Sequence, residues 1–232
     1  MATWGRYLRP SVWPVSTDGD ARPAPTVTGN LNPVTDKEIV PMSTPWQPRF
    51  GAVCGILLAL SIGVPGAIEA FTGETALTSL VIGLGTAFGA PAIVAFHGHQ
   101  AAASGRFGAI AYGANMIGLG LFTGVAFALN LVIFFQDAPV VPMPTKIALQ
   151  VSSLVFVVGT ALFGVAMVRA KVFPAVPAWG YGVSFTLLAV FAALPDTPLT
   201  GVLHVVCAAV LIWLSMTVWS RQDSPARERA LA

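Results

Sequence analysis

Long apolar runs dominate the chain after residue 49, and short polar joints separate them. Six runs approach or exceed the roughly 20 residues that an α-helix needs to cross a bilayer. They cover residues 50–71, 76–96, 107–135, 147–168, 173–194 and 199–219. The joints are short and carry glycine, proline or charge, which favours antiparallel helical hairpins. We therefore predict an all-α fold, a polytopic bundle of six transmembrane helices with a disordered N-terminal tail.

The composition agrees with an integral membrane protein. Hydrophobic residues make up 55% of the chain and charged residues 9%, whereas a soluble domain carries about 25% charge. The net charge of +2 is too small to indicate an anionic partner such as nucleic acid. Both cysteines, Cys54 and Cys207, lie inside apolar runs and are expected to act as small hydrophobic residues. The lipid bilayer is the expected partner.

Residues 1–48 form a region of different composition. They hold eight of the eighteen prolines together with charges, serine and threonine. Such a segment buries too little apolar surface to offset its ordering entropy. We predict a disordered, proline-rich cytoplasmic tail at 1–48, a transmembrane domain at 49–220 and a short cytoplasmic tail at 221–232. Because residues 1–48 contain tryptophans, a short docking segment is the alternative to a fully disordered tail.

The positive charges predict an orientation. One side of the predicted bundle carries Arg49, Arg106, Arg169, Lys171, Arg221, Arg227 and Arg229, whereas the other side carries Lys146. Cytoplasmic loops of membrane proteins carry the excess of lysine and arginine. We therefore expect a multi-pass plasma-membrane protein with both termini in the cytoplasm. Arginine outnumbers lysine nine to three, which is typical of GC-rich bacterial genomes.

Glycine and proline recur inside the predicted helices. Gly85 and Gly89 are four residues apart, as are Gly120 and Gly124. This spacing lets membrane helices approach closely. Packing within one bundle is one interpretation, and contact with a protein partner or a homodimer is the other. Proline inside a helix removes a backbone hydrogen bond, so kinks are expected near residues 65 and 91.

One group of ionisable residues lies at the predicted outer end of the bundle. His204 is about five residues into the sixth run, roughly 8 Å below the boundary. Asp196 lies on the preceding loop, and Glu69 lies near the end of the first run on the same side. Together they form a speculative outward polar site for a cation or proton. The alternative is a structural histidine bonded to a neighbouring helix.

Other chemistries find little support in the sequence. His97 and His99 point to different faces of a helix and have no third metal ligand nearby. An offset of roughly 20 Å separates His97 from His204 along the bundle, so the two cannot clamp one haem. Neither HExxH nor GxSxG occurs. We assign no catalytic, metal or cofactor-binding residue and expect no cofactor. Interhelical hydrogen bonding is the expected role of Asn115, Asn130 and Gln150.

Four short motifs carry a resemblance to a known group of proteins. They are LFGVAMVR at 162–169, FP at 173–174, AWG at 178–180 and GRFG at 105–108. In these motifs the chain resembles a broad group of uncharacterised six-span bacterial membrane proteins, largely from actinobacteria. The resemblance covers roughly residues 50–219. It implies six spans, and it implies no activity and no functional residue.

Three function classes follow from these observations. The leading hypothesis is a non-enzymatic accessory or scaffold subunit that acts through protein partners. The second is a small transporter or channel subunit that uses the outward polar site. The third is a membrane enzyme acting on lipid or quinone, for which the sequence offers no catalytic group.

Overall fold

The computed structural model describes residues 46–136, 140–191 and 198–231, with the backbone alone from residue 222 onward. These residues lie in one compact unit, Met42–Ala232. They are helical and include no strand, which confirms the predicted all-α class for this part of the chain. Most of the predicted tail at 1–48, and Asp196 of the predicted polar site, lie outside the described residues.

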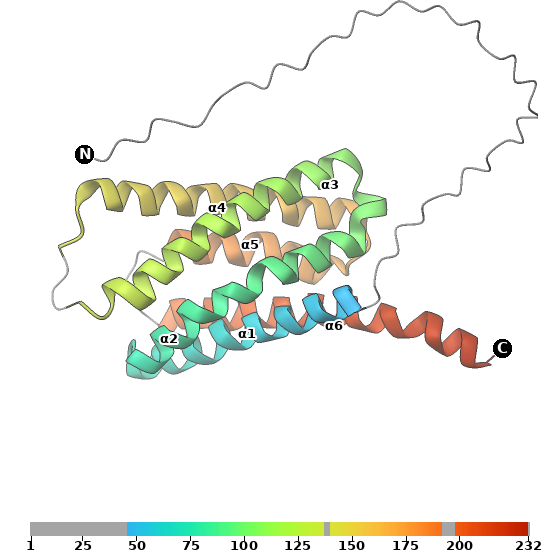
Figure 1. Ribbon diagram of the computed structural model, residues 1–232, viewed down its shortest axis with the longest axis horizontal. Helices are drawn as coiled ribbons and strands as arrows, with labels where there is room; N and C mark the ends of the chain where they lie inside the picture. Colours follow the sequence, from blue (N-terminus) through green and yellow to red (C-terminus); the bar gives the residue numbers. More distant parts are fainter. Residues whose placement is uncertain (1–45, 137–139, 192–197, 232) are drawn as a thin grey trace, which may run out of the picture. The chain divides into compact units, whose positions relative to one another are not determined.

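The described helices follow one another through short connections (Figure 1). In chain order they are α1 (Trp46–Thr72), α2 (Ala76–Gly85), the 3₁₀ turn η1 (Thr86–Phe88), α3 (Gly89–Phe127), the π-helical turn η2 (Ala128–Ile133), α4 (Met143–Ala170), α5 (Ala175–Phe191) and α6 (Pro198–Leu231). The helix α6 thus continues through the predicted C-terminal tail. The sixth apolar run and that tail share one backbone helix.

The chain reverses direction inside α3. Gly105 has φ 57° and ψ −158°, a conformation that only glycine adopts readily, and it lies between two stretches of regular helix. Figure 1 shows the two parts of α3 running back past each other from this point. Between the predicted runs 76–96 and 107–135 the chain therefore turns at Gly105, and the preceding helix continues through His97 and His99.

Four segments are long and apolar enough to cross a membrane. They are Trp46–Thr72, Ala76–Ile133, Met143–Ala170 and Pro198–Arg221. The second is 58 residues long and contains the reversal at Gly105. The remaining apolar helix, Ala175–Phe191, has 17 residues. The number of crossings, six by the sequence pattern, stays a prediction.

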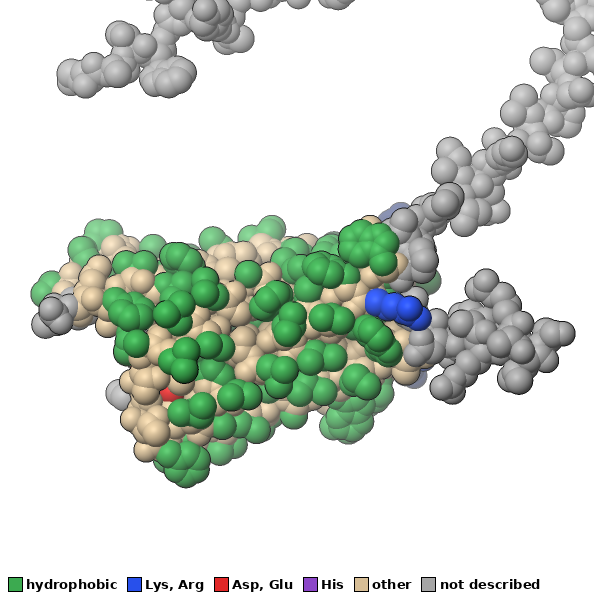
Figure 2. All heavy atoms as spheres, turned by 60° about the horizontal axis from the view of Figure 1, so that its bottom comes forward, with side chains coloured by type: hydrophobic (Ala, Val, Ile, Leu, Met, Phe, Trp, Pro, Cys, Tyr) green, Lys and Arg blue, Asp and Glu red, His purple; other side chains and the backbone are tan. Residues whose placement is uncertain are grey.

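The outer surface of the bundle is apolar. Figure 2 shows hydrophobic side chains spread over the length of the helical body on the face in view, with basic side chains at one end. Large exposed side chains include Phe71 at 92%, Leu77 at 72% and Ile110 at 70%. An aqueous surface rarely exposes so many large apolar groups side by side. The helical body is therefore suited to contact with lipid.

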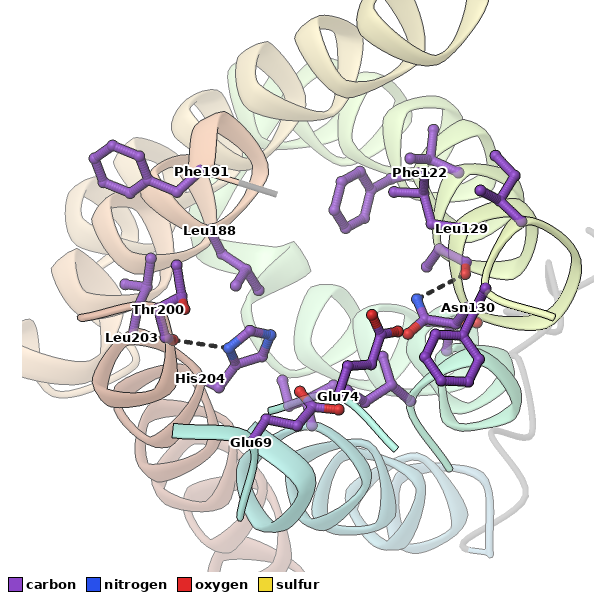
Figure 3. A pocket seen from close by; sticks show the side chains of 17 residues that line it. Glu69, Glu74, Phe122, Leu129, Asn130, Leu188, Phe191, Thr200, Leu203 and His204 are labelled. Atoms are coloured by element: carbon purple, nitrogen blue, oxygen red, sulfur yellow. Dashed lines mark hydrogen bonds between the residues drawn. The ribbon is translucent and has the colours of Figure 1, made fainter. Parts of the chain in front are cut away.

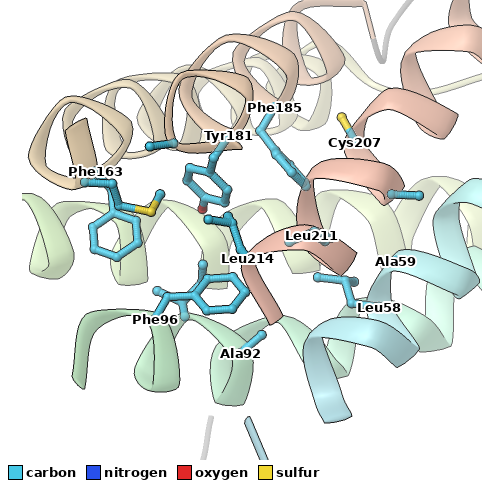
Figure 4. Close-up of a cluster of buried hydrophobic side chains, with 14 of the residues drawn as sticks. Leu58, Ala59, Ala92, Phe96, Phe163, Tyr181, Phe185, Cys207, Leu211 and Leu214 are labelled. Atoms are coloured by element: carbon cyan, nitrogen blue, oxygen red, sulfur yellow. The ribbon is translucent and has the colours of Figure 1, made fainter. Parts of the chain in front are cut away.

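Small residues bring the helices of the bundle close together. A Cβ at Gly118 of α3 would lie 2.7 Å from the Cα of Phe156 on α4, and one at Gly159 of α4 would lie 2.7 Å from the Cα of Asn115. Backbones this close leave no room for a larger residue. Around this contact the core is built from aromatic and aliphatic side chains, among them Phe96, Phe163, Tyr181 and Leu214 (Figure 4).

The two glycine pairs singled out in the sequence have different surroundings. Gly85 packs on the side chain of Ser61 in α1, and a Cβ at Gly89 would lie 3.2 Å from Leu119. The first pair therefore packs within the bundle. A Cβ at Gly120 or Gly124 would meet no atom within 4 Å. The second pair faces open space on the surface of α3.

Pro91 changes the helix that contains it, as expected. Its ring nitrogen cannot donate to the carbonyl of Ala87, four residues earlier. The chain tightens into the 3₁₀ turn Thr86–Phe88 at this place. Pro65, by contrast, lies within the continuous helix α1. The tightened turn matters because Thr86 lines a cavity at one end of the bundle.

Candidate functional site

A cavity of about 410 Å³ lies beside α2, near the ends of α1 and α5 and the beginning of α6 (Figure 3). Side chains from five helices, both short turns and the α1–α2 connection surround it. They are Ile62, Glu69, Glu74, Ile82, Thr86, Phe122, Val125, Ala126, Leu129, Asn130, Ile133, Phe134, Leu188, Phe191, Thr200, Leu203 and His204. Its volume falls in the range of small-molecule sites, about 300–1,000 Å³.

Glu69 reaches the cavity from the last turn of α1. It lies seven residues after Ile62, so both side chains share one face of the helix after two turns. The Glu69 side chain is buried, with 7% of its surface exposed. A carboxylate buried among apolar helices is energetically expensive to retain and is by default a candidate for function.

His204 enters the cavity from α6 beside Glu69 (Figure 3). Its Nδ1 lies 2.8 Å from the carbonyl oxygen of Thr200, one turn earlier in the same helix. Because a carbonyl oxygen only accepts, Nδ1 carries the proton in this bond. In the neutral ring the lone pair is then on Nε2, which is available to the cavity.

Asn130 lies on the opposite wall, in the π-helical turn η2. Its Nδ2 donates to the carbonyl of Ala126 at 2.9 Å. The widened turn is also marked by the bond from the amide of Phe134 to the carbonyl of Leu129 at 3.0 Å. Single π-helical turns within α-helices occur frequently at functional sites. This irregular turn directly follows α3.

Two further polar residues complete the rim. Glu74, in the connection between α1 and α2, accepts a hydrogen bond from the hydroxyl of Ser79 at 2.6 Å. Thr86 of η1 donates its hydroxyl to the carbonyl of Gly83 at 2.8 Å. Both bonds hold the side chains in place beside the cavity. Neither residue was part of the site expected from the sequence.

The remaining walls are apolar. Phe122 is held by stacking on Phe156 of α4, with ring centroids 4.4 Å apart and the planes 9° from parallel. Phe134, Leu188 and Phe191 add further apolar surface. The cavity therefore combines a small set of polar groups with aromatic and aliphatic walls, which is typical of sites for small organic ligands.

The sequence named Glu69, Asp196 and His204 as one site. The structure brings Glu69 and His204 to the same cavity, and Asp196 lies outside the described residues. From the sequence, Asn130 was expected only to form an interhelical hydrogen bond, and Glu74 was not assigned to the site. Their position at the same predicted end of neighbouring runs was the available signal. Their orientation toward one space was not available from local pattern.

The other polar candidates lie elsewhere. His97 stacks on Tyr112, with centroids 4.1 Å apart, and His99 lies against Phe173 at 4.9 Å. Asn115 donates across the bundle to the hydroxyl of Tyr181 at 2.9 Å, as expected of an interhelical amide. Within the described part of the chain, no three His, Cys, Asp or Glu side chains form a group that could hold a metal ion.

Comparison with known proteins adds no assignment. The chain matches no family model, no curated protein and no solved structure. The geometry of the cavity therefore carries the functional argument.

Proposed function

We propose that this protein is a small transporter or channel subunit of the plasma membrane that binds a small solute in the cavity between α1, α3, α5 and α6. One observation supports this above all others. Glu69 and His204, an acid and an imidazole from helices far apart in the sequence, face one cavity inside an otherwise apolar bundle. Intramembrane ionisable groups that face a cavity commonly mark a substrate or ion pathway.

Six crossings fit this proposal. The reversal at Gly105 divides the 58-residue segment into two parts, each longer than the roughly 20 residues that a crossing needs. The helix α5, with 17 residues, meets the lower limit of about 17 for a spanning helix. The resemblance to six-span bacterial proteins is in line with this count and contributes no activity.

The distribution of charge supports cytoplasmic termini. Arg49 lies over the ring of Trp219 at 5.8 Å, and Arg221 donates to the carbonyl of Val172 at 3.3 Å. Arg169 lies over Phe107 at 4.9 Å. These contacts gather the basic residues at the end of the bundle away from the cavity. By the positive-inside rule that end is cytoplasmic, and the cavity faces the outside.

Flux measurements test the proposal. Purified protein would be reconstituted into liposomes, and currents or swelling recorded for panels of small amines, amino acids, sugars and carboxylates. We expect flux for one panel that His204→Ala abolishes and Ser153→Ala preserves. Ser153 is a suitable control because its hydroxyl donates to Leu149 within α4, away from the cavity. The proposal would be overturned if the wild-type protein transported no compound of any panel, or if flux survived His204→Ala.

An accessory or scaffold subunit is the second candidate. The observation that favours it is the exposed pair Gly120 and Gly124, which packs against nothing in the described chain. Exposed small residues at this spacing favour close contact with another membrane helix. Native mass spectrometry after gentle extraction tests this, because a stoichiometric partner or second copy should be lost in Gly120→Leu.

A further inference from the structure

The polar side chains around the cavity share a feature that no single residue shows. Three of them turn a donor away from the cavity. His204 gives its Nδ1 proton to Thr200, Asn130 gives an N–H to Ala126, and Thr86 gives its hydroxyl proton to Gly83. Each of these bonds ends on a backbone carbonyl of the same helical segment. The acceptors left for the cavity are His204 Nε2, Asn130 Oδ1 and the Thr86 hydroxyl oxygen, and the second N–H of the Asn130 amide is the donor that remains among these three side chains.

The charged groups add to this bias. Among the described residues that line the cavity, the charged side chains are two carboxylates, Glu69 and Glu74. Carboxylates accept and do not donate. Glu69 is buried, and its carboxylate, when ionised, interacts more strongly with a positive charge than a carboxylate in water does. The cavity therefore favours a ligand that is both positively charged and rich in N–H donors.

The apolar walls of the cavity determine which kind of body the ligand carries besides its charged group. Phe122 and Leu188 present aromatic and aliphatic surface beside the polar groups. A volume of about 410 Å³ is near the lower end of the usual range of about 300–1,000 Å³. This combination suits a compact apolar body that carries one ammonium group.

We propose that the cavity binds a protonated primary amine with a small apolar body. The ammonium group donates to Glu69, His204 Nε2 and Asn130 Oδ1, and the apolar body lies between Phe122 and Leu188. A quaternary ammonium has no N–H to donate and binds weakly. This substrate class rests on the solute-binding function proposed above.

A set of ligands with one common body tests the class. Binding to the full-length protein in lipid nanodiscs would be measured by calorimetry for 2-phenylethylamine, 2-phenylethanol, 3-phenylpropionate and trimethyl(2-phenylethyl)ammonium. We expect the amine to bind at least about tenfold more tightly than each of the other three, as loss of charge-assisted hydrogen bonds predicts. Hexylamine, with the same ammonium on an aliphatic body, should also bind.

Variants connect the binding to the cavity. Glu69→Gln keeps the shape of the side chain, and His204→Leu removes the Nε2 acceptor. Each should weaken binding of the amine by about tenfold or more, while Ser153→Ala leaves it unchanged. Thermal unfolding of each variant shows that the bundle is intact. If Glu69→Gln alone fails to fold, His204→Leu still carries the test.

The outcomes separate the substrate class from the proposed function. Equal or tighter binding of the alcohol or the carboxylate overturns the amine class and leaves solute binding in place. Amine binding that both Glu69→Gln and His204→Leu leave unchanged overturns the assignment to this cavity. Failure of both amines to bind at millimolar concentration also overturns the inference, and the proposed function then depends on the flux panels alone.

Discussion

Gly66 of α1 lies directly against the imidazole of His204 on α6. A Cβ at position 66 would be 2.6 Å from Cγ and 3.2 Å from Nδ1 of the ring. The absence of a side chain at Gly66 therefore allows the ring to lie against α1 while Nδ1 bonds to Thr200. Gly66, which has no polar side chain of its own, therefore sets the position of the His204 imidazole.

Gly66→Ala is expected to displace the His204 ring and to weaken binding in the cavity. The clash should also destabilise the bundle by about 1–3 kcal/mol, the usual range for overpacking. Calorimetry with 2-phenylethylamine and thermal unfolding measure the two effects. Gly63→Ala is the matched control, because it meets Ala208 on the same α1–α6 interface and lies one turn away from the ring. Equal loss of binding in both variants would contradict a specific role for Gly66.

Gly118 and Gly120 are expected to respond in opposite directions to the same substitution. Gly118→Ala brings a methyl group against the backbone of Phe156 and should destabilise the bundle by about 1–3 kcal/mol. Gly120→Ala meets open space, so the better helix propensity of alanine should keep stability unchanged or raise it by up to about 1 kcal/mol. Unfolding in detergent compares the two. Similar losses at both positions would show that Gly120 is packed against another chain or element.

The hydrogen bond from Asn115 to Tyr181 joins α3 to α5 in the buried core. Tyr181→Phe leaves the Asn115 amide buried without this partner and should lower stability by about 1 kcal/mol, since buried bonds in membrane helices contribute about 0.6–2 kcal/mol. A double-mutant cycle with Asn115→Ala measures the coupling. Tyr112→Phe makes the same chemical change at the half-buried ring stacked on His97 and should cost less. A coupling energy of zero would contradict the bond.

Single cysteines can determine which end of the bundle faces the cytoplasm. Both native cysteines are buried, with Cys54 at 2% and Cys207 at 0% exposure, so neither should react with a maleimide reagent. Thr145→Cys, in the first turn of α4, should react with a membrane-impermeant maleimide on intact cells. Ala102→Cys, in the exposed turn before Gly105, should react only after permeabilisation. The reverse pattern would place the cavity on the cytoplasmic side.

Local pattern was sufficient for the secondary structure. Each apolar run predicted a helical segment, because a helix that contacts lipid must be apolar along most of its length and must satisfy its own backbone bonds. The helices before Gly105 and after Trp219 extend beyond the runs that predicted them. The joints followed from glycine, proline and charge, and Gly105 lies at the end of one predicted joint. The expected distortion near Pro91 is present as the 3₁₀ turn η1. Each of these properties depends on residues that are neighbours in the sequence.

The local sequence pattern did not predict contacts between residues that are far apart in the sequence. The spacing of Gly85 and Gly89 is the same as that of Gly120 and Gly124, yet the first pair packs within the bundle and the second faces open space. Nothing in the local sequence distinguishes them, because the difference lies in which helix is adjacent. The π-helical turn that carries Asn130 likewise has no sequence signal of its own.

The sequence by itself determined the helical class, the apolar outer surface and the placement of Glu69 and His204 near one end of the bundle. Those features follow from hydropathy, length and the alternation of chain direction, which are local or additive. Only the tertiary structure decided that these side chains share one cavity and that their neighbours present acceptors to it. The physical reason is that the direction in which a side chain points depends on the rotation and close packing of its helix. Distant residues such as Gly66 control both.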